Sequence, residues 1–209
     1  MPALAGSGIQ FLDPRELDDQ GRAWLADYFR REVGPVLTPL AFDPAHPFPQ
    51  LLNKAMNLVV RLEQTHHGEV RSRIAFVQVP RVLPRLVELP SQDNARRYLF
   101  LGKVIAENLA TLFPGTKIQG SWIVRVTRNG ELYIDEEETS NLLKAVENEL
   151  RNRRRGEAVR LEVERDCPPD IRAFLLEQLN LTDDDLFVID RKSTRLNPVT
   201  LESRMPSSA

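Results

Sequence analysis

Cysteine is almost missing from this 209-residue chain, in which Cys167 is the one cysteine. A single cysteine excludes an internal disulfide framework and a zinc site built from several thiolates, and it is typical of a reducing compartment. Long apolar runs are lacking as well, since none approaches the roughly 18 to 20 residues that span a bilayer. The N-terminus has no basic and apolar signal-peptide regions. We therefore expect a cytoplasmic protein without a transmembrane segment.

The chain also lacks a strong net charge of either sign, because it has 28 basic and 30 acidic side chains and a formal net charge of −2. No global basic field indicates nucleic acid or an anionic membrane, so any polyanion site must be local. The hydrophobic fraction of 42% suffices for the core of one large domain or two small ones. Residues 191–209 differ from the rest, with four basic side chains against Glu202.

Hydrophobic periodicity predicts several helices and strands. Helical spacing marks the segments Trp24–Val33, Leu99–Phe113, Asp135–Arg155 and the stretch from Pro168-Pro169 to Leu179. Strand patterns mark Asn57–Glu63, Arg73–Val79, Leu83–Leu89, Ser121–Thr127, Glu131–Ile134, Ala158–Val163 and Leu186–Ile189. The fold class that follows is α+β, with a mixed, mainly antiparallel sheet and packed helices.

Connections are predicted from turn residues. The first two strands should form a hairpin through the polar stretch 64–72, with Leu83–Leu89 as a neighbouring strand. Asn129-Gly130 favours a tight hairpin turn, because both residues tolerate positive φ angles. Residues 35–50 contain five prolines and should form an ordered loop mostly outside regular ladders.

A series of motifs resembles the polyphosphate kinase family, the type that autophosphorylates on histidine. The motifs are Val33-Gly34-Pro35-Val36-Leu37-Thr38-Pro39-Leu40, Asp43-Pro44-Ala45-His46-Pro47-Phe48-Pro49, Leu52-Asn53-Lys54, Val79-Pro80-Arg81-Val82-Leu83-Pro84-Arg85, Leu112-Phe113-Pro114-Gly115, Arg125-Val126-Thr127-Arg128-Asn129 and Cys167-Pro168-Pro169. The resemblance covers roughly residues 8–190 and breaks off at Arg191.

This resemblance implies the head domain of a longer enzyme. The parent would transfer the γ-phosphate of ATP, with Mg, through a phosphohistidine to polyphosphate, in later domains that the resemblance does not cover. We thus expect an N-terminal amphipathic helix over 1–34, the head domain over 35–190 and a non-native or disordered tail over 191–209. The chain alone should be inactive, with no catalytic residue, metal site or bound cofactor of its own. Its expected partners are polyphosphate, bound weakly, the parent's catalytic domains and further copies of the chain, but no nucleic acid.

Five cations in the motifs are the candidates for polyphosphate contact: Lys54, Arg81, Arg85, Arg125 and Arg128. Guanidinium groups match phosphate oxygens bidentately, and Arg125 and Arg128 are the first choice. Their odd spacing puts them on opposite faces of an ideal strand, so shared contact would need a bulge or turn. We expect that replacing both with glutamine weakens binding and leaves the melting temperature nearly unchanged. For each of the five, an ordinary surface or structural role is the simpler alternative.

Other polar groups have simpler explanations. His66 and His67 are expected in a solvated loop, and His46 as a hydrogen-bonding residue that fixes its proline-rich loop. The arginines of 151–155 suit a helix C-terminus and the acidic residues 135–138 suit a helix N-terminus. No lysine follows Gly120 where a phosphate-binding P-loop requires one.

A second hypothesis is a stand-alone α+β module that binds RNA or another polyanion. RNA-binding sheets stack bases on aromatic side chains. The predicted strands offer mainly Phe76, Trp122 and Tyr133 for this purpose. The polyphosphate kinase reading is therefore preferred.

Overall fold

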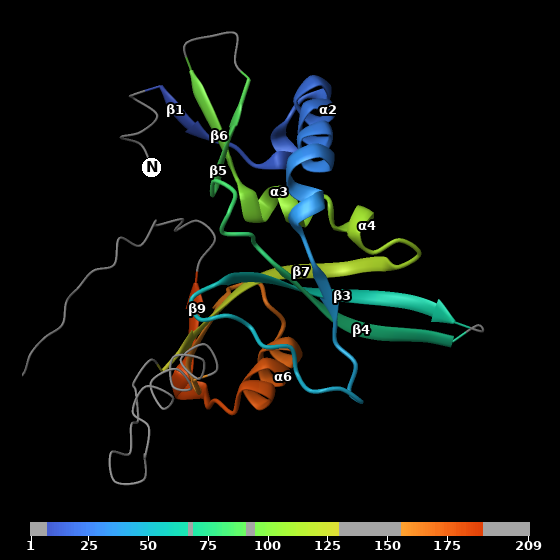
Figure 1. The fold of residues 1–209 in the computed structure, drawn as a ribbon, viewed down its shortest axis with the longest axis vertical. Coiled ribbons are helices and arrows are strands. Elements are labelled where there is room, and N and C mark those ends of the chain that lie inside the picture. The colour runs from blue at the N-terminus through green and yellow to red at the C-terminus, as the bar shows by residue number, and fades with distance from the viewer. Residues whose placement is uncertain (1–7, 67–68, 91–94, 130–155, 190–209) are drawn as a thin grey trace, which may run out of the picture.

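The structure, a computed structural model, describes residues 8–66, 69–90, 95–129 and 156–189 (Figure 1). Its helical elements are η1 (Pro14–Glu16), α2 (Asp19–Tyr28), η2 (Phe29–Val33), η3 (Gly34–Val36), α3 (Leu101–Glu107), α4 (Leu109–Leu112), α6 (Pro169–Leu179) and η4 (Asp183–Asp185). Its strands are β1 (Ile9–Phe11), β2 (Pro39–Ala41), β3 (Met56–His66), β4 (Glu69–Gln78), β5 (Leu86–Leu89), β6 (Arg96–Phe100), β7 (Lys117–Arg128), β8 (Ala158–Glu164) and β9 (Leu186–Ile189). Among the described residues no helix is long and apolar enough to cross a membrane.

The larger sheet has six strands in the order β2-β4-β3-β7-β8-β9. β3 and β4 form the predicted antiparallel hairpin, with Asn57 opposite Gln78 and His66 opposite Glu69. β7 and β8 extend the sheet antiparallel, whereas β9 lies parallel to β8 at the edge. A mixed, mainly antiparallel sheet with packed helices confirms the predicted α+β class.

Alternation along the strands divides the core between the two faces of this sheet. On one face Leu58, Val60 and Val77 pack in a buried cluster with α2 and α3. On the other face Val59 and Phe76 pack in a second cluster with α6. Figure 1 shows α2 and α3 on one side of the sheet and α6 on the other. At the Met56 end of β3, Arg81 and Arg128 both contact the loop that precedes the strand.

Several predicted elements agree with the structure. The helix predicted over Trp24–Val33 is present as α2 and η2, beginning earlier at Asp19, where the Asp18 side chain accepts the Gly21 N–H at 2.7 Å. β8, α6 and β9 lie where the sequence places them.

The helix predicted over Leu99–Phe113 is wrong in its details. Leu99 and Phe100 belong to β6, and the helix begins at Leu101. It is interrupted at Asn108, whose side-chain amide donates to the Val104 carbonyl at 2.9 Å. An asparagine side chain that bonds the carbonyl four residues back competes with the backbone ladder, which explains the break.

A second sheet, with strand order β1-β6-β5, has no counterpart in the sequence-based prediction. The strand predicted over Leu83–Leu89 is shortened to β5 by Pro84 and pairs with β6, so it is not a neighbour of the β3–β4 hairpin. The proline-rich loop also contributes a strand, because β2 pairs with β4 at the sheet edge. Pro39 is its first residue, a position where the missing N–H does little harm.

The predicted strand 131–134, the helix 135–155 and the tail 191–209 lie outside the described residues. Asn129 is described, and its N–H donates to the Glu157 carbonyl at 2.8 Å. A tight Asn129-Gly130 hairpin would place residue 131 opposite Arg128. In the structure, Arg128 pairs with Ala158 of β8.

Candidate functional site: a basic surface around the Asn53 loop

The residues Leu51–Ala55, here called the Asn53 loop, lead directly into β3. The Lys54 N–H donates to the Val126 carbonyl at 2.7 Å, and the Ala55 N–H donates to the Leu52 carbonyl at 3.1 Å. These bonds hold Lys54 at a φ of 55°, in the left-handed region. A lysine there is strained, because its Cβ crowds the following carbonyl oxygen. The fold therefore fixes the backbone of Lys54 while its side chain stays exposed.

Two of the predicted arginines bind the Asn53 loop. Arg128 donates from Nε to the Leu51 carbonyl at 2.9 Å and from Nη1 to the Gly156 carbonyl at 2.8 Å. Its backbone N–H donates to the Asn53 Oδ1 at 3.0 Å. Burial lowers the pKa of Arg128 below the usual value for arginine. Arg128 thus has a structural role between the loop and the ends of β7 and β8.

Arg81 approaches the loop from the other side, where its Nη2 donates to the Asn53 carbonyl at 2.6 Å. Arg85 lies four residues further along the same connecting segment, and its carbonyl accepts the Leu101 N–H at 2.9 Å. The side chains of Lys54, Arg81 and Arg85 are exposed. Within the described residues none of these three cations pairs with a carboxylate. Leu52 and Val82, which are 37% and 79% exposed, lie beside them in the chain.

We call this set the basic loop surface: Leu52, Lys54, Arg81, Val82 and Arg85. Unpaired cations fixed on short, hydrogen-bonded loops are able to bind phosphate oxygens without first breaking an ion pair.

Arg125 differs from these residues. It forms an ion pair with Glu162 on the neighbouring strand β8, and the Glu162 side chain is only 7% exposed. Arg160 also reaches Glu162, at 3.0 Å. Alternation in the sequence Arg160-Leu-Glu-Val-Glu164 was a signal that these polar groups share one sheet face, but the pairing partner could not be read from it.

The structure does not bring Arg125 and Arg128 together. The register between β7 and β8 shifts after Thr127, and the extra residue is Val159 on β8. Alternation along β7 is therefore kept, so the two arginines lie on opposite faces of the sheet. Because each has a defined structural partner, we now expect a loss of stability when either is replaced, contrary to the sequence-based expectation.

The histidine predictions have a mixed outcome. His46 is confirmed as a hydrogen-bonding loop residue, with its Nδ1 3.2 Å from the Asp43 Oδ2. The pKa of Asp43 is lowered, first by the backbone N–H of Ala45 and also by His46. His66 belongs to β3 and not to a loop, whereas His67 lies outside the described residues.

The described part of the chain contains no group of three His, Cys, Asp or Glu side chains that could hold a metal ion. The acidic residues 135–138 and the arginines of 151–155 lie outside the residues that the structure describes. Of the three aromatic residues proposed for base stacking, the structure describes Phe76 and Trp122, and neither offers an open ring face. Phe76 is buried, and the guanidinium of Arg61 covers the ring of Trp122 at 5.7 Å.

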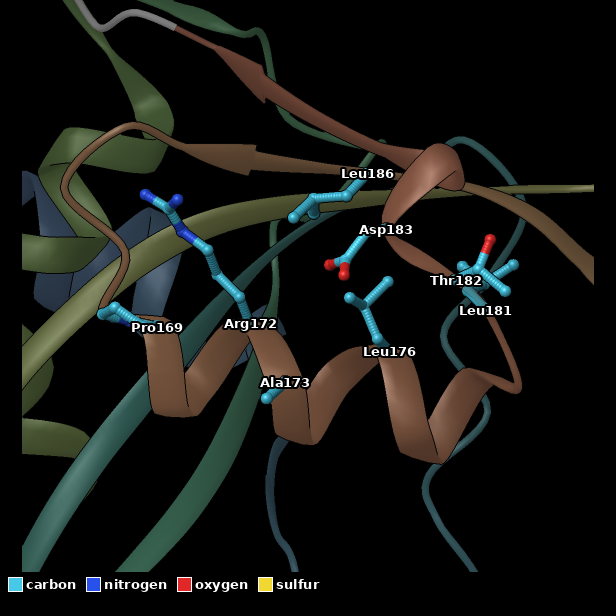
Figure 2. Close-up of a pocket in the computed structure, with 8 residues that line it drawn as sticks. All are labelled: Pro169, Arg172, Ala173, Leu176, Leu181, Thr182, Asp183 and Leu186. Atoms are coloured by element: carbon cyan, nitrogen blue, oxygen red, sulfur yellow. The ribbon is translucent and has the colours of Figure 1, made fainter.

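A groove of about 560 Å³ lies between α6 and the segment leading into β9 (Figure 2). Leu176, Leu181 and Leu186 supply much of its lining. Arg172 points away from Asp183 toward the segment before α6, where it donates to the Arg165 carbonyl at 2.5 Å. The groove therefore lacks a pair of facing polar groups that could act on a substrate.

Comparison with known proteins identifies the family. A family model described as "Polyphosphate kinase middle domain" matches residues 20–199, so the match continues past Arg191, where the resemblance was expected to end. The chain belongs to the polyphosphate kinase family. A polyphosphate kinase of Neisseria meningitidis serogroup C is 43% identical over 190 residues, which cover 90% of this chain and 28% of that protein. A polyphosphate kinase of Pseudomonas aeruginosa is 38% identical over 208 residues, which cover 97% of this chain and 30% of that protein.

The fold agrees with a solved relative. The crystal structure of polyphosphate kinase from Porphyromonas gingivalis matches with a TM-score of 0.72 and 23% identity, over 90% of this chain and 26% of that chain. The chain thus spans less than a third of the length of each of these relatives.

Proposed function

We propose that this middle domain is an accessory part of a polyphosphate kinase that contacts the polyphosphate substrate and contributes to homo-oligomer contacts. The parent enzyme transfers the γ-phosphate of ATP, with Mg, to polyphosphate through a phosphohistidine in polypeptide outside the matched residues. The chain alone is then inactive. The observation that carries the substrate contact is the basic loop surface, in which three exposed cations lack acidic partners within the described residues.

Physical reasoning ranks the five candidate cations. Lys54, Arg81 and Arg85 are available to an anion, whereas binding by Arg125 would compete with Glu162. Arg128 already donates to two carbonyl groups. We therefore propose that polyphosphate binds the basic loop surface, that Arg128 supports the Asn53 loop behind it, and that Arg125 has a structural role in its ion pair with Glu162.

The test is binding of fluorescently labelled long polyphosphate to the 209-residue chain at several salt concentrations. The variant Lys54→Gln/Arg85→Gln removes two charges and leaves the Arg81 hydrogen bond intact. Its matched control, Arg30→Gln/Arg31→Gln on η2, removes two charges that pair with Asp27. We expect only the first variant to weaken binding. The slope of log K against log salt concentration should also become shallower by about 0.7 for each lost phosphate contact, the value for single-stranded nucleic acids.

The variant Lys54→Gly distinguishes a loss of polyphosphate affinity from a loss of stability. Glycine adopts the left-handed region freely, so removing the strain should raise stability by about 1 kcal/mol while the loss of the cation lowers affinity. Equal binding by wild type and by both glutamine variants would overturn the assignment of the surface. If RNA at the same concentration of negative charge displaced polyphosphate completely, the result would instead favour a general polyanion-binding module.

A further inference from the structure

β9 forms an open edge of the six-stranded sheet. Within the described strands it pairs only with β8, in parallel, from Leu186 opposite Leu161 to Ile189 opposite Glu164. The Ile189 carbonyl accepts the Arg165 N–H at 2.9 Å, on the β8 side. Neighbouring residues of a strand direct their backbone groups to opposite sides. The N–H and C=O of Val188 therefore point outward, away from the sheet.

Three consecutive apolar side chains on this edge are exposed: Phe187 at 42%, Val188 at 46% and Ile189 at 38%. Phe187 lies on the face that carries Glu162, and the Arg160 guanidinium covers its ring at 3.7 Å. Val188 lies on the opposite face, in register with Val163. The edge therefore offers apolar surface on both faces together with an unpaired outward backbone.

Exposed strand edges pair readily with other strands, and the devices by which proteins block them include proline and charged side chains. At the opposite edge of this sheet, β2 begins with Pro39, which has no N–H to donate. β9 has no proline and no charged side chain among its four residues. Among the described strands, the β9 edge therefore lacks the proline that the β2 edge carries.

We propose that the β9 edge receives an extended strand from the part of the kinase polypeptide that lies outside the matched residues, with apolar side chains alternating along it. The added strand would bond to the outward N–H and C=O of Val188 and cover Phe187, Val188 and Ile189. This inference goes beyond polyphosphate contact and depends only on family membership.

The size of the edge favours a strand of the same polypeptide over a second copy. A stable complex between separate proteins buries about 1,200 to 2,000 Å² in total, far more than a four-residue strand offers alone. Covalent linkage raises the effective concentration to about the millimolar range, so a small contact suffices. The matched residues are 28% of the Neisseria relative, so most of that polypeptide is available as the donor.

Val188→Pro is the diagnostic variant. It removes the outward N–H and leaves the ladder to β8 intact, and proline is tolerated on an edge strand when its nitrogen faces away from the sheet. Val188→Thr is the matched control, because it keeps the N–H and the β-branched shape. Leu40→Thr makes the same kind of change at the β2 edge, where Leu40 is 46% exposed.

The experiment compares amide hydrogen exchange in the 209-residue chain and in a hybrid in which it replaces the matched part of the Neisseria meningitidis kinase. We expect the Val188 amide to exchange at least tenfold more slowly in the hybrid. Val188→Pro should increase exchange in the added strand, whereas Val188→Thr and Leu40→Thr should not. If the hybrid fails to fold, the residue aligned with Val188 is changed to proline in the intact Neisseria kinase and the same segment is followed.

Two results would overturn the proposal. Equally fast exchange of the Val188 amide in the chain and in the hybrid would mean that the edge stays open. Protection in the isolated chain that increases with protein concentration would identify a second copy as the occupant. Neither measurement of amide exchange involves polyphosphate. A failure of the β9 proposal is therefore distinguishable from a failure of the proposed function.

Discussion

Replacing Arg125 with glutamine should destabilise the fold, because it leaves the Glu162 carboxylate in the sheet with one cation fewer. The Glu162 side chain is 7% exposed and that of Arg125 is 33% exposed. Removing one partner of a buried ion pair costs about 3–5 kcal/mol. Arg160 still reaches Glu162, at 3.0 Å, and is itself 42% exposed. Partial compensation and partial exposure reduce the expected loss to about 1–3 kcal/mol.

Urea and thermal unfolding of the 209-residue chain measure this loss. For a domain of this size about 1 kcal/mol lowers the melting temperature by about 2–4 °C, so a loss of about 2 kcal/mol corresponds to about 4–8 °C. A double-mutant cycle with Glu162→Gln isolates the pair. If the carboxylate causes the loss, Arg125→Gln should cost much less when Glu162→Gln is already present.

Arg160→Gln is the matched control, since it removes the more exposed of the two cations that reach the same carboxylate. We expect a smaller loss than for Arg125→Gln. An Arg125→Gln chain that unfolds within about 0.3 kcal/mol of the wild type would refute the reasoning, since that is the usual scatter for independent surface sites. Arg125 would then be as available to phosphate as Lys54.

Three further predictions concern single sites. Asp18→Ala should cost about 1 kcal/mol in urea unfolding, because it removes the acceptor for the Gly21 N–H at the start of α2; Asp18→Asn, which keeps an acceptor, should cost less. Gly120→Ala should cost about 1–3 kcal/mol, because a Cβ there would lie 2.6 Å from the Trp122 ring; an unchanged melting temperature would show that the ring moves freely. Burial raises the pKa of the Cys167 thiol to about 11, above the usual 9.0. The unfolded thiol ionises first, so stability should fall as the pH rises from 9 to 11, and Cys167→Ala should fall less steeply.

Much of the central sheet could be predicted because its pattern is local. β3 and β4 combine β-branched residues with alternation, and the buried side chains of the two faces follow that alternation. β8 was predicted from alternation as well, whereas β9 was predicted from a short apolar run. The start of α6 was also readable, since Pro169 occupies its first turn.

The second sheet could not be predicted, because its strands depend on distant partners. β6 is the segment Arg96–Phe100, whose burial does not alternate strictly, and its last residues directly precede the apolar stripe of α3. A helical reading therefore extended over Leu99 and Phe100. β1 pairs with β6 across more than 80 positions of sequence, from Ile9 opposite Arg96 to Phe11 opposite Tyr98. Short strands of this kind are determined by tertiary pairing rather than by propensity.

The candidate site shows the same division between local and distant information. Motif resemblance singled out all five cations, but only the register of β7 against β8 separates Arg125, which faces Glu162, from Arg128, which holds Leu51. Local alternation puts the two arginines on opposite faces of β7, but it does not identify the partner of either one.

The exposed position of Lys54 follows from the contacts between the Asn53 loop and β7. The Asn53 loop is bound to β7, because the Val126 carbonyl accepts the Lys54 N–H and Arg128 donates to the Leu51 carbonyl. Lys54 is left exposed in a strained backbone conformation. Strained residues persist where the surrounding structure over-determines them, and they cluster at ligand-binding positions. A fixed loop loses little conformational entropy when an anion binds. Arg128 is half-buried and binds the loop that carries the exposed Lys54. We therefore expect Arg128→Gln to weaken polyphosphate binding through the loop. If Arg128→Gln left affinity unchanged while Lys54→Gln reduced it, the loop would not need this support.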